Sequence, residues 1–124
     1  MTIFEKKKFE RHTFKKFRDE ISIKQRENVE KNVKLYVDSF VKEHKNIGYI
    51  AIYWPLNNEI DIRSLKDKIS LALPRCKDNK ELLFYPWDEK PLTRDSEGIL
   101  SPNNSFSLSH KQISLIFVPC LSVD

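Results

Sequence analysis

The sequence predicts an α/β domain in which N-terminal helices pack on a mostly parallel sheet. Three observations lead to this fold class. Two segments with helical periodicity come first, two nearly continuous apolar runs at 47–54 and 113–118 are typical of strands buried on both faces, and helical and strand patterns alternate between them. The chain of 124 residues accommodates one domain, 1–124. We expect three layers, α/β/α, with a sheet that is incomplete at the C-terminus.

Two helices are predicted at the N-terminus. The first spans 5–20, where a few aromatic residues lie among charges: Phe9, Phe14 and Phe17. The second begins near Ile23, because Ser22 and Gln25 form the S-x-x-Q pattern of a capping box. It carries apolar residues at helical spacing and ends at 44–46.

The rest of the chain predicts mainly strands. The run 47–54 is the first buried strand, followed by a turn and a short amphipathic helix that includes Ile60, Ile62, Leu65 and Ile69. Two short strands, 71–76 and 82–85, are separated by a polar turn. A long polar stretch, 86–106, is predicted as a loop, and 113–118 as a final buried strand stopped by Pro119.

Composition excludes several classes of function. The only two glycines, Gly48 and Gly98, form neither a Walker A loop nor a G-x-G-x-x-G loop. No apolar run approaches the length of a membrane span, so we expect no membrane partner. Cys76 and Cys120 show no metal or redox spacing and are interpreted as reduced thiols of a cytoplasmic protein, with a single disulfide between them as the less favoured alternative. The three histidines also lack ligand spacing, and no metal ligand is predicted.

The positive charge is concentrated near the N-terminus. Residues 1–46 hold 13 Lys and Arg against 8 Asp and Glu, whereas the whole chain has a net charge of +4. A basic segment attracts anions such as nucleic acid or phosphate esters. A lysine-rich, solvated helix face explains the same pattern, and charge alone favours that interpretation.

A few residues are candidates for ligand contact, each with a structural alternative. Glu59 follows a predicted strand end and lies near Trp54, which suits a ligand; otherwise Glu59 is a solvated turn residue and Asp61 an N-cap. Arg75 can bind a carboxylate or phosphate, or form a minor surface salt bridge. Trp87 can stack on a ring, although anchoring a loop is the commoner role.

Together these segments resemble the 5-formyltetrahydrofolate cyclo-ligase family, also called methenyltetrahydrofolate synthetase. The resemblance covers nearly the whole chain as a series of short pieces in order. They are Lys7 and Arg11 followed by Ile21-Ser22, Ile50-Ala51-Ile52-Tyr53, Glu59-Ile60-Asp61, Leu73-Pro74-Arg75, Leu82-Leu83-Phe84, Trp87, Leu92, Gly98-Ile99 and Leu115-Ile116-Phe117-Val118-Pro119. The family continues into a glycine-rich loop beyond Asp124, so the chain is expected to be the N-terminal two-thirds of such a domain.

The resemblance implies ATP-dependent cyclisation of 5-formyltetrahydrofolate to 5,10-methenyltetrahydrofolate. It implies that Lys7, Lys8 and Arg11 contact ATP, and that Trp54 and Glu59 hold the folate substrate. ATP and Mg²⁺ are the expected cofactors, with magnesium contacts mainly from the segment after Asp124. We expect a cytoplasmic monomer that binds no nucleic acid.

Two alternatives remain open. In the first alternative to the enzyme, the chain is a non-catalytic fragment that binds folate or nucleotide weakly. In the second, it is a small nucleic-acid-binding module that uses its basic helix. The module ranks last, because the aromatic residues near the basic ones fit a helix core better than an exposed stacking platform.

Overall fold

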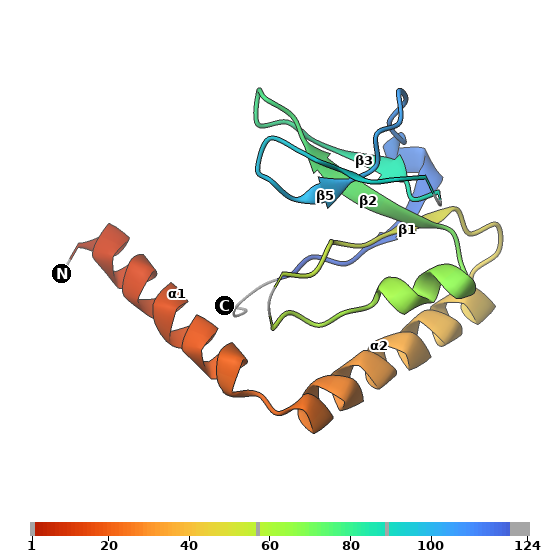
Figure 1. Cartoon of the computed structure of the whole chain (residues 1–124). Helices are drawn as coiled ribbons and strands as arrows, with labels where there is room; N and C mark the ends of the chain where they lie inside the picture. The colour runs from red at the N-terminus through yellow and green to blue at the C-terminus, as the bar shows by residue number, and fades with distance from the viewer. Residues whose placement is uncertain (1, 57, 89, 120–124) are drawn as a thin grey trace.

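A computed structural model describes residues 2–56, 58–88 and 90–119. Two α-helices, α1 (Ile3–Glu20) and α2 (Ile23–Glu43), precede a four-stranded sheet. Its strands are β1 (Tyr49–Ala51), β2 (Leu71–Cys76), β3 (Leu82–Pro86) and β6 (Ile113–Ile116). Two 3₁₀ turns, η1 (Arg63–Asp67) and η2 (His110–Gln112), and a short hairpin of β4 (Thr93–Arg94) with β5 (Leu100–Ser101) complete the elements (Figure 1).

The sheet is mostly parallel, as predicted. Its strand order is β3-β2-β1-β6. β1 pairs in parallel with both β2 and β6, whereas β2 and β3 form an antiparallel hairpin. Consecutive residues Ile50 and Ala51 are both fully buried, so β1 is covered on both faces. The predictions of an α/β fold and of a central strand buried on both faces are confirmed.

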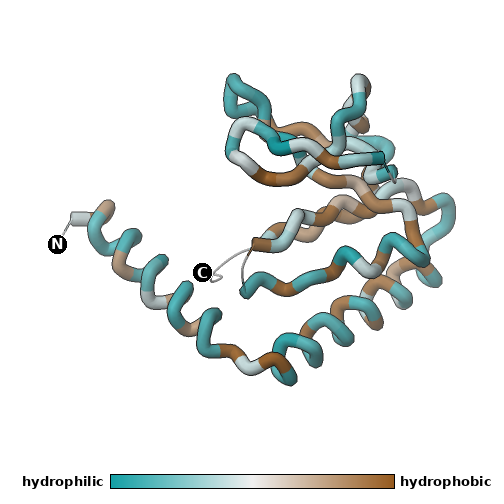
Figure 2. Tube along the Cα trace, in the orientation of Figure 1, coloured by the Kyte–Doolittle hydropathy of each residue, from teal (hydrophilic) through white to brown (hydrophobic). Residues whose placement is uncertain are grey.

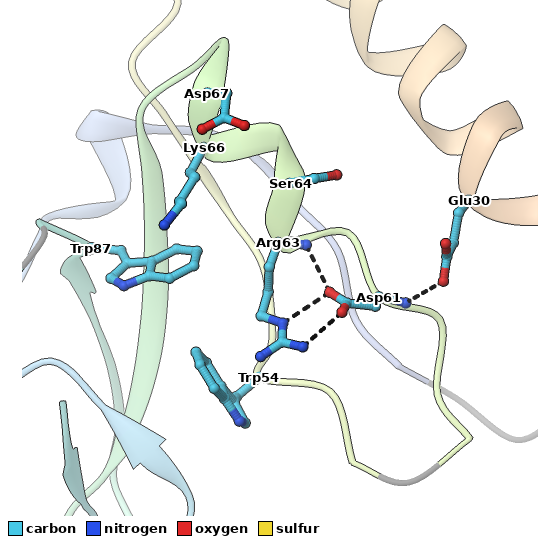
Figure 3. A pocket seen from close by; sticks show the side chains of 8 residues that line it. All are labelled: Glu30, Trp54, Asp61, Arg63, Ser64, Lys66, Asp67 and Trp87. Carbon is cyan, nitrogen blue, oxygen red and sulfur yellow. Dashed lines mark hydrogen bonds and ion pairs between the residues drawn. The ribbon is translucent and has the colours of Figure 1, made fainter. Parts of the chain in front are cut away.

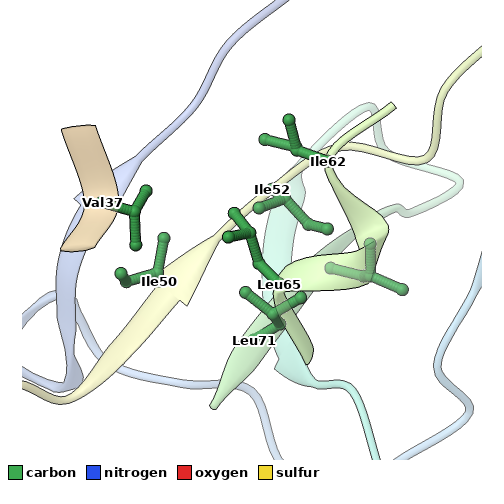
Figure 4. Close-up of a cluster of buried hydrophobic side chains, with 7 residues drawn as sticks. Val37, Ile50, Ile52, Ile62, Leu65 and Leu71 are labelled. Carbon is green, nitrogen blue, oxygen red and sulfur yellow. The ribbon is translucent and has the colours of Figure 1, made fainter. Parts of the chain in front are cut away.

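The core lies between α2, η1 and the sheet. Val37 is the one buried residue of α2, and it packs against Ile50 of β1 (Figure 4). Ile62 and Leu65 complete the cover from the η1 segment. Figure 2 shows hydrophobic residues gathered along the strands, whereas α1 is largely hydrophilic.

The expected three-layer arrangement is not seen in the part of the chain that the structure describes. α1 has no buried residue, and Figure 1 shows it directed away from the sheet. The reason is that its aromatic residues are few and interrupted by charges, so it has no broad apolar stripe to bury. Only α2 forms a helical layer on the sheet.

Three local predictions need correction. The amphipathic helix expected around 60–69 is the single 3₁₀ turn η1, although its apolar residues Ile62 and Leu65 are buried as expected. The loop predicted over 86–106 contains the β4–β5 hairpin. The strand expected to be buried at 113–118 ends at Ile116 and alternates between half-buried and exposed, because it has one strand neighbour, β1, within the described residues.

The capping box predicted at Ser22 and Gln25 is confirmed. The Gln25 backbone N–H donates to Ser22 Oγ at 3.2 Å, and the Ser22 N–H donates to Gln25 Oε1 at 3.1 Å. Thr2 and Glu5 form a second capping box at the start of α1. Both helices therefore begin where their local sequence satisfies the free N–H groups of the first turn.

Candidate functional site

An apolar groove lies at the carboxyl ends of β1 and β6. In an open parallel sheet, ligands bind beyond the carboxyl ends of strands whose connections run in opposite directions. β1 and β6 are parallel neighbours, and the connection that leaves β1 leads to β2 on its other side, so the groove lies at the strand ends where this rule places ligands. The groove has a volume of about 520 Å³, within the range of small-molecule sites.

Segments far apart in the sequence form the groove. Phe14 and Phe17 come from α1, Val29 and Val33 from α2, and Tyr53 from the segment after β1. The segment after β6 closes it with a last group of residues: Phe117, Val118 and Pro119. The polar lining residues are Arg18, Arg26, Asn58 and Glu59. A mostly apolar cleft with a few polar groups is what a flat, partly polar ligand requires.

Glu59 is held in the groove wall by two contacts. Its Oε1 accepts the backbone N–H of Leu56 at 2.7 Å, and its Oε2 lies 3.5 Å from Nη1 of Arg18. Only 11% of the Glu59 side chain is exposed. Glu59 is thus not the solvated turn residue that we considered as an alternative.

Arg18 connects the groove to a second cavity. This cavity has a volume of about 420 Å³ and is lined by Lys15, Arg18, Trp54, Pro55, Leu56, Arg94, Gly98, Ile99 and Leu100. Arg18 Nε is buried and has no hydrogen-bond acceptor among the described residues. The second cavity, which we call the cationic cavity, therefore contains three positively charged side chains and no carboxylate in its lining.

Trp54 lines both the cationic cavity and a third pocket, which is drawn in Figure 3. Its ring lies edge-on to Trp87, with centroids 6.0 Å apart, and the guanidinium of Arg63 lies 4.5 Å from its centroid. Lys66 lies in the same way over Trp87 at 5.0 Å. Cations over indole faces are favourable contacts, so both tryptophans are held by their neighbours.

Asp61 orients Arg63 on this ring. Arg63 Nε and Nη2 donate to the two Asp61 carboxylate oxygens at 2.9 and 2.7 Å, and the Arg63 backbone N–H also donates to Oδ1. The side-chain hydrogen bond from Arg63 lowers the pKa of Asp61 below 3.8 and outweighs the opposing effect of burial. The same bond raises the pKa of Arg63. Asp61 is not the N-cap that we considered, because Ile62 holds that position in η1, although the Asp61 carboxylate accepts the N–H of Arg63.

The structure places the predicted site residues in different surroundings. Glu59 lines the groove, whereas Trp54 lines the two neighbouring pockets. Lys7, Lys8 and Arg11 are exposed on α1 and line none of these pockets. Their assignment to ATP stays a prediction.

Arg75 and Trp87 have structural roles. The guanidinium of Arg75 lies 3.9 Å from the Tyr85 ring centroid and donates to the carbonyls of Pro102 and Asn104. Arg75 therefore forms no salt bridge with any described residue, and its binding of an anionic ligand stays a prediction. The backbone N–H of Trp87 donates to the Leu71 carbonyl, and its ring packs against the core, as expected of an anchor.

Sequence reasoning did not single out Arg94. It lies in the predicted loop, and no local pattern marks it. Only its place in the β4–β5 hairpin brings it to the same cavity as Lys15 and Arg18. For Lys15 and Arg18 the sequence did hold a signal. The excess of positive charge in residues 1–46 indicated anion binding at this end of the chain.

The remaining predictions concern metal ligands, membrane spans and the two cysteines. Within residues 2–56, 58–88 and 90–119, no cluster of three or more His, Cys, Asp or Glu side chains is positioned to bind a metal. Nor does any helix in these ranges have the length and apolarity to cross a membrane. Cys76 is a free thiol, whereas Cys120 lies outside the described residues.

Fold and site together define an open α/β sheet protein with an apolar groove at its strand ends. No family model matches the sequence, and no curated protein matches it. The NMR structure of Aquifex aeolicus 5,10-methenyltetrahydrofolate synthetase has a similar fold, with a TM-score of 0.72 and 22% sequence identity. The similarity covers 90% of this chain and 59% of the synthetase chain. The predicted resemblance to the cyclo-ligase family is confirmed at the level of the fold.

Proposed function

We propose that the chain binds a reduced folate and ATP for the cyclisation of 5-formyltetrahydrofolate to 5,10-methenyltetrahydrofolate. The observation that carries this proposal is the apolar groove at the carboxyl ends of β1 and β6, with the Glu59 carboxylate in its wall. The fold shared with a methenyltetrahydrofolate synthetase supports it. Since the chain spans 59% of that protein's length, the complete reaction is part of the proposal.

The groove suits the pterin end of a folate. Its Phe and Val side chains provide apolar contact for a flat ring, and a carboxylate can accept hydrogen bonds from ring N–H and amino groups. Glu59 is the carboxylate that we assign to this role. Trp54 lines the cationic cavity together with Arg18. We propose that Trp54 contacts the part of the folate that extends beyond the groove.

The cations of α1 suit the phosphates of ATP. Lys7, Arg11, Lys15 and Arg18 recur at helical spacing and form one stripe along α1, which we call the basic stripe. Two of its members, Lys15 and Arg18, line the cationic cavity. We propose that Lys7 and Arg11, with the neighbouring Lys8, attract and hold the phosphate chain. Guanidinium and ammonium groups are the usual partners of phosphate oxygens.

Magnesium is a different case. No group of three or more His, Cys, Asp or Glu side chains among the described residues could hold a metal ion. Magnesium is usually bound through one or two carboxylates together with substrate phosphates, and we assign it no ligand among the described residues. Positioning and charge neutralisation dominate catalysis of phosphoryl transfer, and the cations and Glu59 can supply both.

A binding measurement on the full chain tests the proposal. We expect 5-formyltetrahydrofolate to bind, and Glu59→Gln to weaken its binding by roughly 10–100-fold, the loss for one charged hydrogen bond. The glutamine keeps an oxygen for the Leu56 N–H, but it replaces the other carboxylate oxygen with an NH2 group and ends the ion pair with Arg18, so the thermal unfolding of the variant is compared with that of wild type. Glu97→Gln, at a surface ion pair with Lys80, is the matched control.

Three results would contradict the proposal. They are the absence of folate binding, equal affinity for wild type and Glu59→Gln, or an equal loss in Glu97→Gln. The near-ultraviolet absorbance of the methenyl product, followed with ATP and magnesium, reports whether the chain also completes the reaction.

A further inference from the structure

The positively charged side chains of the cationic cavity have few ion-pair or hydrogen-bond partners among the described residues. Arg18 has a single ion pair, with Glu59, and its Nε is unsatisfied among the described residues. Arg94 donates from Nη1 to the Gly98 carbonyl at 2.7 Å, which uses one of the five N–H donors of a guanidinium. Lys15 forms no ion pair with any described residue. Three cations with unused donors therefore line one cavity.

The hairpin that carries Arg94 is built around Asp95. Asp95 Oδ1 accepts the backbone N–H groups of Glu97 and Ile99 at 2.9 and 3.0 Å, and Oδ2 accepts the Cys76 N–H at 2.9 Å. Gly98 has a φ of +78°, which glycine adopts without strain. The loop is thus tied to the end of β2, and Arg94 projects from a defined turn.

We propose that Arg94, with Lys15 and Arg18, forms a binding site for a phosphoryl group in the cationic cavity. The donor chemistry fits: two guanidinium groups offer forked N–H pairs, and the ammonium group adds a point charge. The basic stripe of α1 leads to the cavity, so a chain of phosphates held along α1 would end between α1 and the hairpin. This inference rests on the proposed function where it assigns the phosphoryl group to a nucleotide.

Inorganic tripolyphosphate tests the site without a nucleoside. Its binding to the full chain is measured by calorimetry, and the intrinsic fluorescence of the two tryptophans gives a second readout, since Trp54 lines the cavity. We expect Arg94→Ala to weaken binding by roughly tenfold or more and Arg94→Lys to weaken it less, because the lysine keeps the charge but not the fork. Lys31→Ala, an exposed cation of α2, is the matched control.

Folding is controlled separately. Arg94→Ala removes the bond to the Gly98 carbonyl, so its thermal unfolding is compared with that of wild type. Lys15→Ala loses no ion pair within the described residues and tests the same cavity from α1. A tenfold loss in Lys15→Ala supports the site even where Arg94→Ala is unstable.

The possible failures are distinct. The site is wrong if tripolyphosphate binds equally to wild type, Arg94→Ala and Lys15→Ala, if Lys31→Ala weakens it as much, or if no tripolyphosphate binds. Binding that depends on Arg94 while 5-formyltetrahydrofolate does not bind supports the site and overturns the proposed function. Adding ATP distinguishes the source: competition with tripolyphosphate identifies a nucleotide phosphate, whereas no competition overturns the assignment to a nucleotide.

Discussion

The guanidinium of Arg18 pairs with the carboxylate of Glu59, with 3.5 Å between Nη1 and Oε2. This ion pair joins the last turn of α1 to the loop after β1. The neighbouring residues add a second link, because Asn58 Nδ2 donates to Asp19 Oδ1 at 2.8 Å. α1, which buries no residue of its own, is therefore positioned at its C-terminal end by polar contacts.

Removing the charge of Arg18 should destabilise the chain. Arg18→Gln leaves the Glu59 carboxylate, whose side chain is 11% exposed, without its charged partner. We expect the free energy of unfolding to fall by about 1–2 kcal/mol, since a largely desolvated carboxylate loses a partner. Urea unfolding measures this change. Arg26→Gln is the control, because Arg26 lines the same groove without an ion pair in the described residues. An equal loss in both variants would show that the pair has no special role.

Gly48 should resist substitution because of a close backbone approach. A Cβ at this position would lie only 2.4 Å from the carbonyl oxygen of Gln112. We expect Gly48→Ala to lower the free energy of unfolding by about 1–3 kcal/mol, the usual cost of overpacking. Lys45→Ala, in the same connection between α2 and β1, is the control and should be nearly neutral. Denaturant unfolding of the two variants checks the prediction, and equal midpoints would refute it.

The contribution of Asp95 to stability should depend on pH. Burial opposes ionisation of Asp95, but hydrogen bonds from the backbone of Cys76, Ile99 and Glu97 outweigh it and lower the pKa below 3.8. A carboxyl whose pKa is lower in the folded state stabilises the fold above its unfolded pKa. That contribution is lost as the pH falls from about 4 through the folded pKa.

Asp95→Ala should therefore be less stable than wild type at pH 7, and the difference should shrink below about pH 4. Urea unfolding between pH 3 and 7 measures it. Asp78→Ala, in the exposed turn between β2 and β3, is the control and should show no such trend. A difference that stays constant across this pH range would contradict the assigned hydrogen bonds.

Arg63 should determine the pKa of Asp61. The hydrogen bond from Arg63 is the largest cause of the lowered value, whereas Lys34 contributes the smallest electrostatic effect. We expect Arg63→Met to raise the Asp61 pKa toward 3.8, and Lys34→Met to change it less. An NMR titration of the Asp61 carboxyl carbon follows both variants. Equal shifts in the two would mean that Arg63 acts only as a distant charge.

The local sequence alone determined several elements of this protein. Ser22 and Gln25 specify where α2 begins, because the capping box needs only residues three positions apart. The continuous apolar run around Ile50 and Ala51 specifies a strand buried on both faces. A similar apolar run at 113–118 predicted a buried strand, but Ile116 is exposed. Among the described strands β6 has one neighbour, and the number of neighbours, not the apolar run, decides how far a strand is buried.

The tertiary structure decided where charged and aromatic side chains meet. Glu59 and Trp54 are near in sequence, yet they line different pockets because the turn between them is closed by the Glu59 bond to Leu56. Arg94 reaches the cavity of Lys15 and Arg18 only through the fold of its hairpin. Helix starts depend on neighbours within a few residues, whereas the burial of a strand and the assembly of a binding site depend on long-range packing, which sequence spacing does not encode.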